Sequence, residues 1–203
     1  MKFVSFLIKG QPKFGVSDGK NITDLTGKIK GAQTLKELII NNSINEAKEF
    51  SKKNPGKINV DEIDYLPVIP NPGKIVCVGL NYSEHVKETG RTVEQNPVIF
   101  LRVPESQTAH KQPIQRPKVS ESLDYECEMA VIMGDAGKHI QPKDALKHII
   151  GYSCYNECTV REWQQHTRQF GMGKNFERTG SFGPHMAVSY THLRAHETLR
   201  YLV

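Results

Sequence analysis

The sequence predicts a mainly β protein with short helices, in which a small α+β N-terminal domain precedes a larger β domain. Runs that alternate apolar and polar residues are frequent, whereas stretches with helical periodicity are few. A proline-rich segment, residues 66–73, separates the two regions, because proline continues neither a helix nor a sheet ladder. No glycine-rich nucleotide loop occurs in the chain, which argues against a doubly wound α/β fold.

The first 65 residues predict a small β-meander followed by two short helices. We expect strands at residues 2–9, 14–16 and 22–25 and helices at residues 35–39 and 44–50. The turn signal Asp18-Gly19 lies between the second and third strands. We therefore expect an N-terminal domain over residues 1–65 and a linker over residues 66–73.

Strand-like runs dominate the region after the linker. Strands are expected at residues 74–80, 98–101, 125–133 and 148–154, and one helix at residues 144–148. Within the third strand, residues 130–133 are all apolar, and we expect them to be buried. This second domain is expected to extend over residues 74–188.

Composition and charge restrict the classes of function. The 203 residues are 37% hydrophobic and 24% charged, which excludes a disordered chain, a collagen and a coiled coil. The net charge is +5, but the basic residues are scattered, so the sequence predicts neither a nucleic-acid nor a membrane surface and is compatible with an anionic small-molecule substrate. A nucleic-acid binder would rest on net charge alone, since aromatic and basic residues are not interleaved.

The lack of a recognisable targeting signal and the cysteine usage both lead us to expect a cytoplasmic protein. No apolar run approaches the roughly 20 residues of a membrane helix, and the N-terminus alternates like a strand rather than a signal peptide. The four cysteines do not form the spacing of a disulfide framework or a zinc site, so we expect them to be reduced.

An acidic segment around residue 126 is the most informative part of the sequence. In a strand, Asp124, Glu126 and Glu128 would point to one side and their neighbours to the other. Carboxylates gathered in this way are the ligands preferred by Mg²⁺ or Mn²⁺. The alternative interpretation is a solvated acidic strand end beside a lysine or arginine.

Two other segments carry candidate chemistry. His85 and Glu88 are three residues apart, so on a helical turn the carboxylate could make the imidazole a general base; such pairs are also common on surface helices. Glu157 ends a strand-like run and is a third acidic candidate. Lys174 lies among small residues and could neutralise an oxyanion, or could be a solvated loop lysine.

Five motifs in order resemble the fumarylacetoacetate hydrolase family. They are KIVCVGLNYSEHVKE, PVIFLR, LDYECEMAVIMG, GYSCYNECTVREWQ and GKNFERTGSFGP, within residues 74–187. The N-terminal meander also resembles the small N-terminal domain of many members. The resemblance implies a β-roll catalytic domain, a homodimer, and hydrolase or lyase activity that cleaves or rearranges C–C bonds of 2-oxo or 2,4-dioxo acids through a metal-bound enolate.

The resemblance also implies roles for eight residues. The metal ligands for Mg²⁺ or Mn²⁺ would be Glu126, Glu128 and Glu157; the catalytic residues His85, Glu88 and Lys174; the substrate-binding residues Arg102 and Gln164. Family members that share this set of metal ligands perform hydrolysis, decarboxylation or isomerisation, so the type of reaction stays open. The alternative is a member that has lost catalysis and serves as a small-molecule binding module.

The chain departs from the family pattern in two places. Glu157 stands where the family has Asp, and the longer side chain predicts weaker Mg²⁺ binding and a relative preference for Mn²⁺. Residues 189–203 do not follow the family pattern and resemble a translated sequencing adapter. We therefore expect the complete gene product to be the active enzyme, and the chain as written to be an incomplete β-roll with unpaired strand edges that is inactive or poorly soluble.

Overall fold

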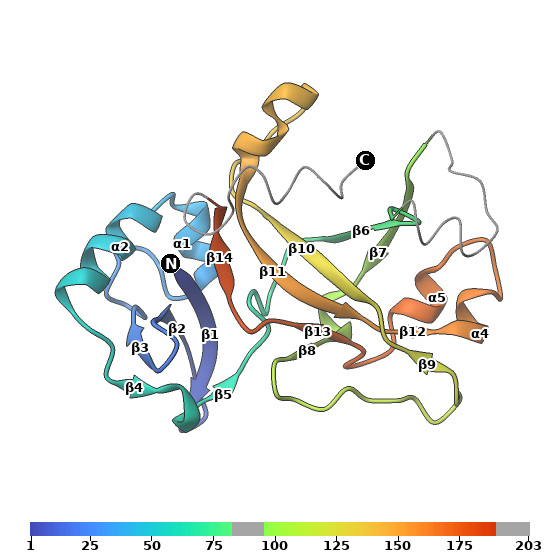
Figure 1. Ribbon diagram of the computed structural model, residues 1–203, viewed down its shortest axis with the longest axis horizontal. Coiled ribbons are helices and arrows are strands. Elements are labelled where there is room, and N and C mark those ends of the chain that lie inside the picture. Colours follow the sequence, from blue (N-terminus) through green and yellow to red (C-terminus); the bar gives the residue numbers. More distant parts are fainter. Residues whose placement is uncertain (83–95, 190–203) are drawn as a thin grey trace.

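The computed structural model describes residues 1–82 and 96–189 (Figure 1). The strands are β1 (Lys2–Ile8), β2 (Gln11–Ser17), β3 (Asn21–Asp24), β4 (Ile58–Asn59), β5 (Asp64–Tyr65), β6 (Ile75–Gly79), β7 (Val98–Arg102), β8 (Gln107–Ala109), β9 (Leu123–Asp124), β10 (Cys127–Met133), β11 (Ile149–Glu157), β12 (Thr159–Val160), β13 (Gly180–Phe182) and β14 (Met186–Val188). The helices are α1 (Leu35–Ile40), α2 (Ile44–Lys53), α4 (Arg161–Gln164) and α5 (Gly171–Lys174), with 3₁₀ turns η1 (Val60–Glu62), η2 (Pro104–Ser106) and η3 (Pro142–His148). The mainly β prediction is confirmed.

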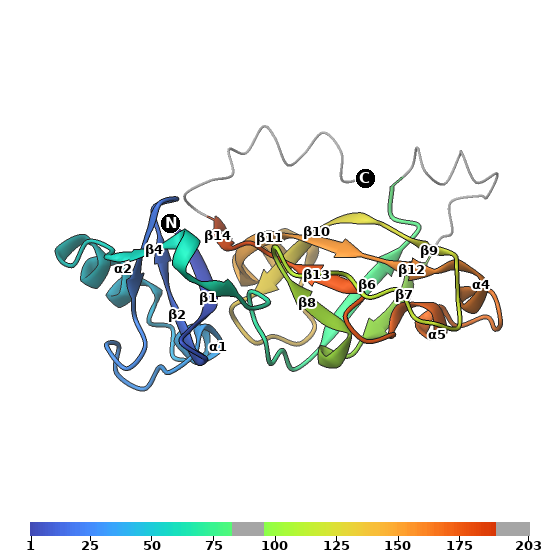
Figure 2. The same ribbon diagram turned by 90° about the horizontal axis from the view of Figure 1, so that it is seen from below.

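One curled sheet connects the two ends of the described chain. Its strand order is β4-β3-β2-β1-β14-β11-β13-β8, with β10 paired to β11 and β5 paired to β1. The first strand, β1, pairs with β14 near the far end of the chain, with Phe3 opposite Met186. Figure 2 shows the resulting elongated arrangement, with the meander at one end and α4 and α5 at the other.

The N-terminal region forms as its sequence pattern predicts. The strands β1, β2 and β3 make an antiparallel meander, and α1 begins at a capping box in which Thr34 and Glu37 satisfy each other's backbone N–H groups. Leu35 and Leu38 of α1 are buried against Phe3 and Phe14 in the main apolar core. Burial of this helix face, rather than helix propensity alone, therefore holds α1 in place.

The proline-rich segment crosses the core instead of lying free of it. Val68 is fully buried, its N–H donates to the Phe182 carbonyl, and its carbonyl accepts from the Ser5 hydroxyl. The main core contains residues from both sides of this segment, including Phe3 and Met186. The domain boundary at residues 66–73 stays a prediction, and the structure adds that the two regions share a sheet and a core.

Two expectations about the second region are corrected. Val131 and Met133 are 44% and 54% exposed, although we expected residues 130–133 to be buried. In the described ranges β10 pairs only with β11, so one edge of this strand is open, and burial alternates along it, since Ile132 is only 5% exposed. The helix expected at residues 144–148 is the 3₁₀ turn η3, which begins at Pro142 and leads into β11.

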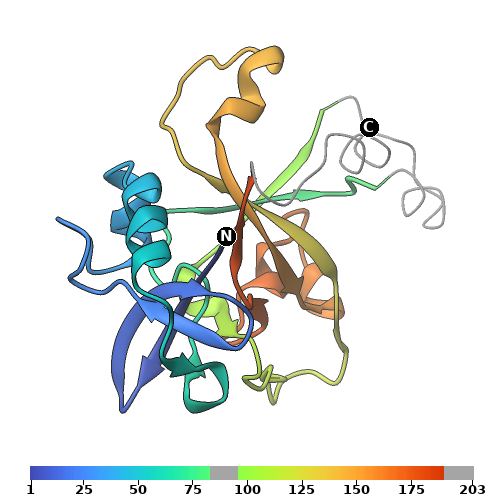
Figure 3. The same cartoon turned by 60° about the vertical axis from the view of Figure 1, so that its left-hand side comes forward.

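The hairpin β6–β7 forms a separate two-stranded sheet, with Val76 opposite Leu101. Figure 3 shows it crossing beneath the long strands β10 and β11. Its connecting residues include 83–95, which lie outside the described residues, as does the tail over 190–203. The prediction about the tail therefore stays a prediction.

Candidate active site

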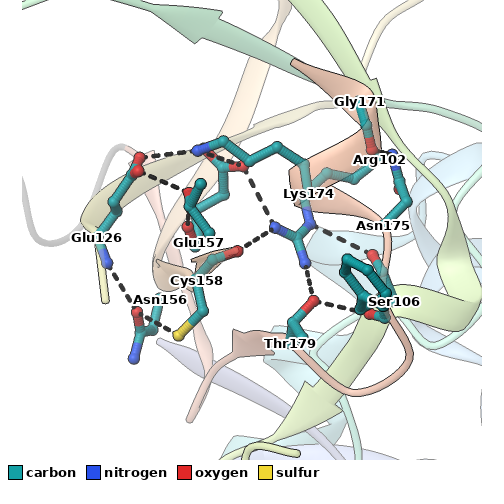
Figure 4. A network of polar contacts seen from close by, with 12 residues as sticks. Arg102, Ser106, Glu126, Asn156, Glu157, Cys158, Gly171, Lys174, Asn175 and Thr179 are labelled. Carbon is teal, nitrogen blue, oxygen red and sulfur yellow. Dashed lines mark hydrogen bonds and ion pairs between the residues drawn. The ribbon is translucent and has the colours of Figure 1, made fainter. Parts of the chain in front are cut away.

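Lys174 brings two of the predicted carboxylates together. Its ammonium nitrogen Nζ lies 2.9 Å from Oε2 of Glu126 and 3.2 Å from Oε1 of Glu157, and its side chain is 2% exposed (Figure 4). Glu157 ends β11, whereas Glu126 lies between β9 and β10. The interpretation of Lys174 as a solvated loop lysine is therefore wrong, because the ammonium is buried in an ion-pair cluster.

A close contact between α5 and the preceding elements sets the position of Lys174. A Cβ atom on Gly173 would lie 2.6 Å from both the Val160 carbonyl oxygen and the Gln164 backbone nitrogen. Glycine is thus required where α5 meets β12 and α4. The next residue, Lys174, then extends its ammonium to 5.0 Å from the centroid of the Phe100 ring.

Glu126 is oriented by two residues that sequence reasoning did not select. The Thr159 hydroxyl donates to Oε1 of Glu126 at 2.6 Å, and NH1 of Arg161 lies 2.7 Å from the same oxygen. Burial opposes ionisation of Glu126, but Lys174, Thr159 and Arg161 outweigh it, so the pKa of this carboxyl lies below its usual value. The alternation between Glu157, Thr159 and Arg161 after β11 was the signal available in the sequence.

Burial also opposes ionisation of Glu157 and Glu128, and in these two carboxyl groups it outweighs the other contributions to the pKa. It raises the pKa of Glu157, although Lys174 and Arg102 counteract it, and Glu126 adds to the rise. Burial also raises the pKa of Glu128; a hydrogen bond from the Tyr82 hydroxyl counteracts it, and the charges of Glu157 and Glu126 add to it. The three carboxyl groups are therefore close enough to influence one another, and the pKa of Glu126 is lowered while those of Glu157 and Glu128 are raised.

Arg102 lies inside the protein rather than facing solvent. Its side chain is fully buried, and NH1 lies 3.3 Å from Oε1 of Glu157. The guanidinium also donates to Ser106, Thr179 and the Cys158 carbonyl. The substrate contact expected for Arg102 stays a prediction, and the structure shows where the guanidinium donors go.

The remaining predicted residues lie at the edge of this cluster or outside the described part. Gln164 is on α4, where its side-chain oxygen accepts from NH1 of Arg161 at 3.4 Å. His85 and Glu88 fall within residues 83–95, so the predicted dyad lies outside the described residues.

A cavity of about 540 Å³ adjoins the cluster. Its walls come mainly from β6 and β10, and Glu128 and Glu157 lie on its wall together with Tyr82 and Tyr155. Most of the remaining lining is aliphatic, including Ile75 and Ile132. The acidic cluster thus opens on an apolar space that could accommodate a small organic molecule.

The donor set has the chemistry of a hard divalent cation site. The carboxylate oxygens of Glu126 and Glu157 already converge on one positive group, the Lys174 ammonium. Within residues 1–82 and 96–189, no three His, Cys, Asp or Glu side chains are arranged as a formed metal site. The residues fit a divalent cation by ligand type, and two of them fit it by convergence.

The structure is thus a curled β-sheet that carries a buried cluster of carboxylates and cations beside a cavity. Such a cluster is typical of an enzyme active site. Residues 74–201, more than half of the chain, match the model of the fumarylacetoacetate (FAA) hydrolase C-terminal family. The chain belongs to the fumarylacetoacetate hydrolase family.

Curated relatives include enzymes of oxaloacetate chemistry. A mitochondrial oxaloacetate tautomerase of Xenopus laevis is 31% identical over 180 residues, which cover 85% of this chain and 56% of the relative. A human mitochondrial oxaloacetate tautomerase is 34% identical over 125 residues, or 61% of this chain and 40% of the relative. The chain therefore spans about half the length of these relatives.

Solved structures share the fold. A fumarylacetoacetate hydrolase from psychrophilic Exiguobacterium antarcticum has a TM-score of 0.79 and 30% identity, with 93% of this chain and 66% of that one covered. A maleylpyruvate hydrolase from Sphingobium sp. SYK-6, solved with manganese(II) and pyruvate, has a TM-score of 0.74 and 21% identity, covering 94% of this chain and 68% of that one. The second likeness shows the fold alone.

Proposed function

We propose that this protein is a divalent-metal-dependent enzyme acting on 2-oxo or 2,4-dioxo acids. The observation that carries the proposal is the convergence of Glu126 and Glu157 on the buried ammonium of Lys174. A cluster of this kind stabilises charge that develops on a small acid, and the adjoining cavity supplies a space for it. Oxaloacetate, which the tautomerase relatives are named for, is a 2-oxo acid.

Glu126, Glu128 and Glu157 would hold Mg²⁺ or Mn²⁺. When bound, the cation would polarise a substrate carbonyl as a Lewis acid. The manganese(II) of the maleylpyruvate hydrolase structure supports this choice of ion for the shared fold. Glu157 in place of Asp supports a preference for Mn²⁺, whose coordination is the more tolerant of the two, as expected from the sequence.

The protein's own residues would supply the remaining chemistry. Lys174 would hold negative charge that develops on the substrate oxygen, because its ammonium is buried and already directed at carboxylate oxygens. His85, assisted by Glu88, would remove a proton from water or from substrate, and Gln164 would contact the substrate. The roles of His85, Glu88 and Gln164 rest on the family resemblance.

Tautomerisation and C–C bond cleavage are the two reactions considered for this site. Tautomerisation needs only proton removal and return beside a carbonyl, whereas cleavage also needs attack by water. The Xenopus laevis relative, which covers 85% of this chain, favours tautomerisation of a 2-oxo acid, and a C–C hydrolase or lyase remains the function expected from the sequence motifs. A binding module without catalysis is the alternative to both.

Turnover measurements on the protein extended to the full length of its relatives test the proposal, because the 203 residues span about half of that length and are expected to be inactive alone. Oxaloacetate tautomerisation and acylpyruvate cleavage are followed by ultraviolet absorbance with added Mn²⁺, with EDTA, and in Glu157→Gln. Lys13→Met, which removes the remote ion pair to Asp24, is the control. We expect Mn²⁺-stimulated turnover of one substrate by the parent and the control only. Binding of Mn²⁺ and pyruvate without turnover would support the binding module instead.

The oligomeric state and the cellular compartment of the protein are also proposed. We propose a homodimer, as in the family, and the cytoplasm as its compartment, on the basis of composition and cysteine usage. In the described part, the cysteines are free and no helix is both long and apolar enough to cross a membrane. We expect no nucleic-acid partner, because the basic residues are scattered along the chain.

A further inference from the structure

Arg102 connects two sheets that share no backbone ladder in the described ranges. It is the last residue of β7, in the separate β6–β7 sheet. Its NH1 group reaches the end of β11, where it lies 3.3 Å from Oε1 of Glu157 and 3.2 Å from the Cys158 carbonyl oxygen. The guanidinium therefore ties the hairpin to the strand end that carries a predicted metal ligand (Figure 4).

The remaining donors of Arg102 are directed at other protein groups. Nε donates to the Ser106 hydroxyl at 3.2 Å, and NH2 donates to the Thr179 hydroxyl at 2.8 Å. The guanidinium carbon lies 5.8 Å from the centroid of the Tyr155 ring. A fully buried guanidinium with these contacts has a fixed orientation, because the planar fork presents its donors in set directions.

Close packing against Gly180 and Tyr155 restricts the guanidinium on one side. A Cβ atom on Gly180 would lie 2.9 Å from NH2 of Arg102 and 2.3 Å from the Tyr155 hydroxyl oxygen. The space on that side is therefore full even with glycine present. A shift of Arg102 would also break its hydrogen bonds with Ser106 and Thr179.

Glu157 receives both of its cationic contacts on one oxygen. Lys174 and Arg102 both reach Oε1, at 3.2 and 3.3 Å. The backbone of Glu157 is fixed separately, because its N–H donates to the Glu126 carbonyl at 2.8 Å. The backbone and Oε1 are thus both held by protein groups, which restricts the rotation of the carboxylate.

We propose that Arg102 is a positioning residue that sets the orientation of the Glu157 carboxylate, in place of the substrate contact expected from the family resemblance. A glutamate has one more rotatable bond than an aspartate, so a fixed partner compensates for its greater freedom. A lysine at position 102 would carry the charge but not the fork. The inference rests on the proposed function only in the experiments that measure Mn²⁺ binding or turnover.

A double-mutant cycle on metal-free protein tests the pairing. Arg102→Lys, Glu157→Gln and the double variant are compared with the parent by their thermal unfolding midpoints. We expect the two single shifts to be non-additive, because each variant removes the same contact. Additive shifts would overturn the proposal, and this arm requires neither metal nor activity.

Metal affinity separates positioning from a merely structural role. Mn²⁺ binding, measured by electron paramagnetic resonance, should be roughly 10-fold or more weaker in Arg102→Lys, as is usual when the partner of a metal ligand is altered. The control Lys13→Met, which breaks the remote pair with Asp24, should bind Mn²⁺ like the parent. A lower unfolding midpoint with unchanged Mn²⁺ affinity in Arg102→Lys would overturn the proposal.

Steady-state kinetics separate positioning from substrate contact. At saturating Mn²⁺, Arg102→Lys should lower kcat for oxaloacetate while KM stays close to that of the parent. A raised KM with unchanged Mn²⁺ affinity would assign Arg102 to the substrate and overturn the proposal. If Arg102→Lys does not fold, Thr179→Val removes one acceptor of Arg102 and should weaken Mn²⁺ binding in the same direction; unchanged binding would count against the proposal.

A parent chain that binds no Mn²⁺ would contradict the proposed function but not the pairing. The metal-free cycle then decides the inference alone, with non-additive shifts supporting it and additive shifts overturning it. The two proposals can therefore fail independently.

Discussion

The ammonium nitrogen of Lys174 and the carboxylate oxygen Oε2 of Glu126 lie 2.9 Å apart, although the two residues are 48 positions apart in the chain. This contact joins α5 to the segment between β9 and β10. It places a positive charge that is 2% exposed between two carboxylates, and so adds to the compensation that Arg161 gives Glu126 and Arg102 gives Glu157. The electrostatics of the candidate site therefore depend on this pair.

Lys174→Met is expected to destabilise the protein and abolish turnover. Removing one partner of a buried ion pair costs about 3–5 kcal/mol, because the remaining charges lose their compensation. Urea unfolding measures the loss. Glu126 would keep Arg161 and Glu157 would keep Arg102, but the ammonium that the two carboxylates share would be gone, so added Mn²⁺ should restore part of the stability. A variant as stable as the parent without metal would contradict this account.

The stabilisation contributed by Glu126 is expected to disappear at acid pH. Its pKa in the folded protein lies below the usual value of 4.5. A lowered pKa contributes stability above the unfolded-state value, and the contribution is lost as the pH falls through the folded-state value. The difference in unfolding free energy between the parent and Glu126→Gln should therefore shrink as the pH falls below about 4.5 and through the lower folded-state pKa. A difference that grows toward low pH would contradict the assignment.

Gly173→Ala is expected to displace Lys174. The new methyl group would lie 2.6 Å from backbone atoms of Val160 and Gln164, so α5 must move. Overpacking of this kind costs about 1–3 kcal/mol. Thermal unfolding and turnover should both decrease, whereas Gly73→Ala, where a Cβ meets no atom within 4 Å, should behave like the parent. Equal behaviour of the two variants would show that the contact is not tight.

The cysteines are expected to differ in reactivity. Burial raises the pKa of Cys77 to about 12, and it also raises the pKa of the buried Cys158. Cys127 and Cys154 are exposed. Because the thiolate is the reactive form, iodoacetamide at pH 8 should label Cys127 and Cys154 first, as measured by peptide mass spectrometry. Faster labelling of Cys77 would contradict its environment in the structure.

The sequence predicted the elements better than it predicted their surroundings. Alternation placed β1 and β6 correctly, because a strand's period is local. It failed for Val131 and Met133, since exposure of those residues depends on what packs against β10, a non-local property. The short strand β14 was missed because its pairing with β1, not its own pattern, holds it in the sheet.

The candidate site was predicted in its acidic residues but not in its partners. The resemblance to the family implied roles for Glu126, Glu157 and Lys174, and the structure brings these three together. Thr159 and Arg161 were missed, because a hydroxyl and a guanidinium near a strand end are common and only the fold directs them at Glu126. His85 and Glu88 stay predictions.

Titration of the metal-free chain with Mn²⁺ tests the central claim most directly. Electron paramagnetic resonance of free Mn²⁺ gives the number of ions bound and their affinity for the parent and for Glu157→Gln. The account predicts one bound ion per chain in the parent and a strongly reduced affinity in the variant. No binding by the parent, or equal binding by both proteins, would contradict the assignment of these carboxylates to a divalent cation.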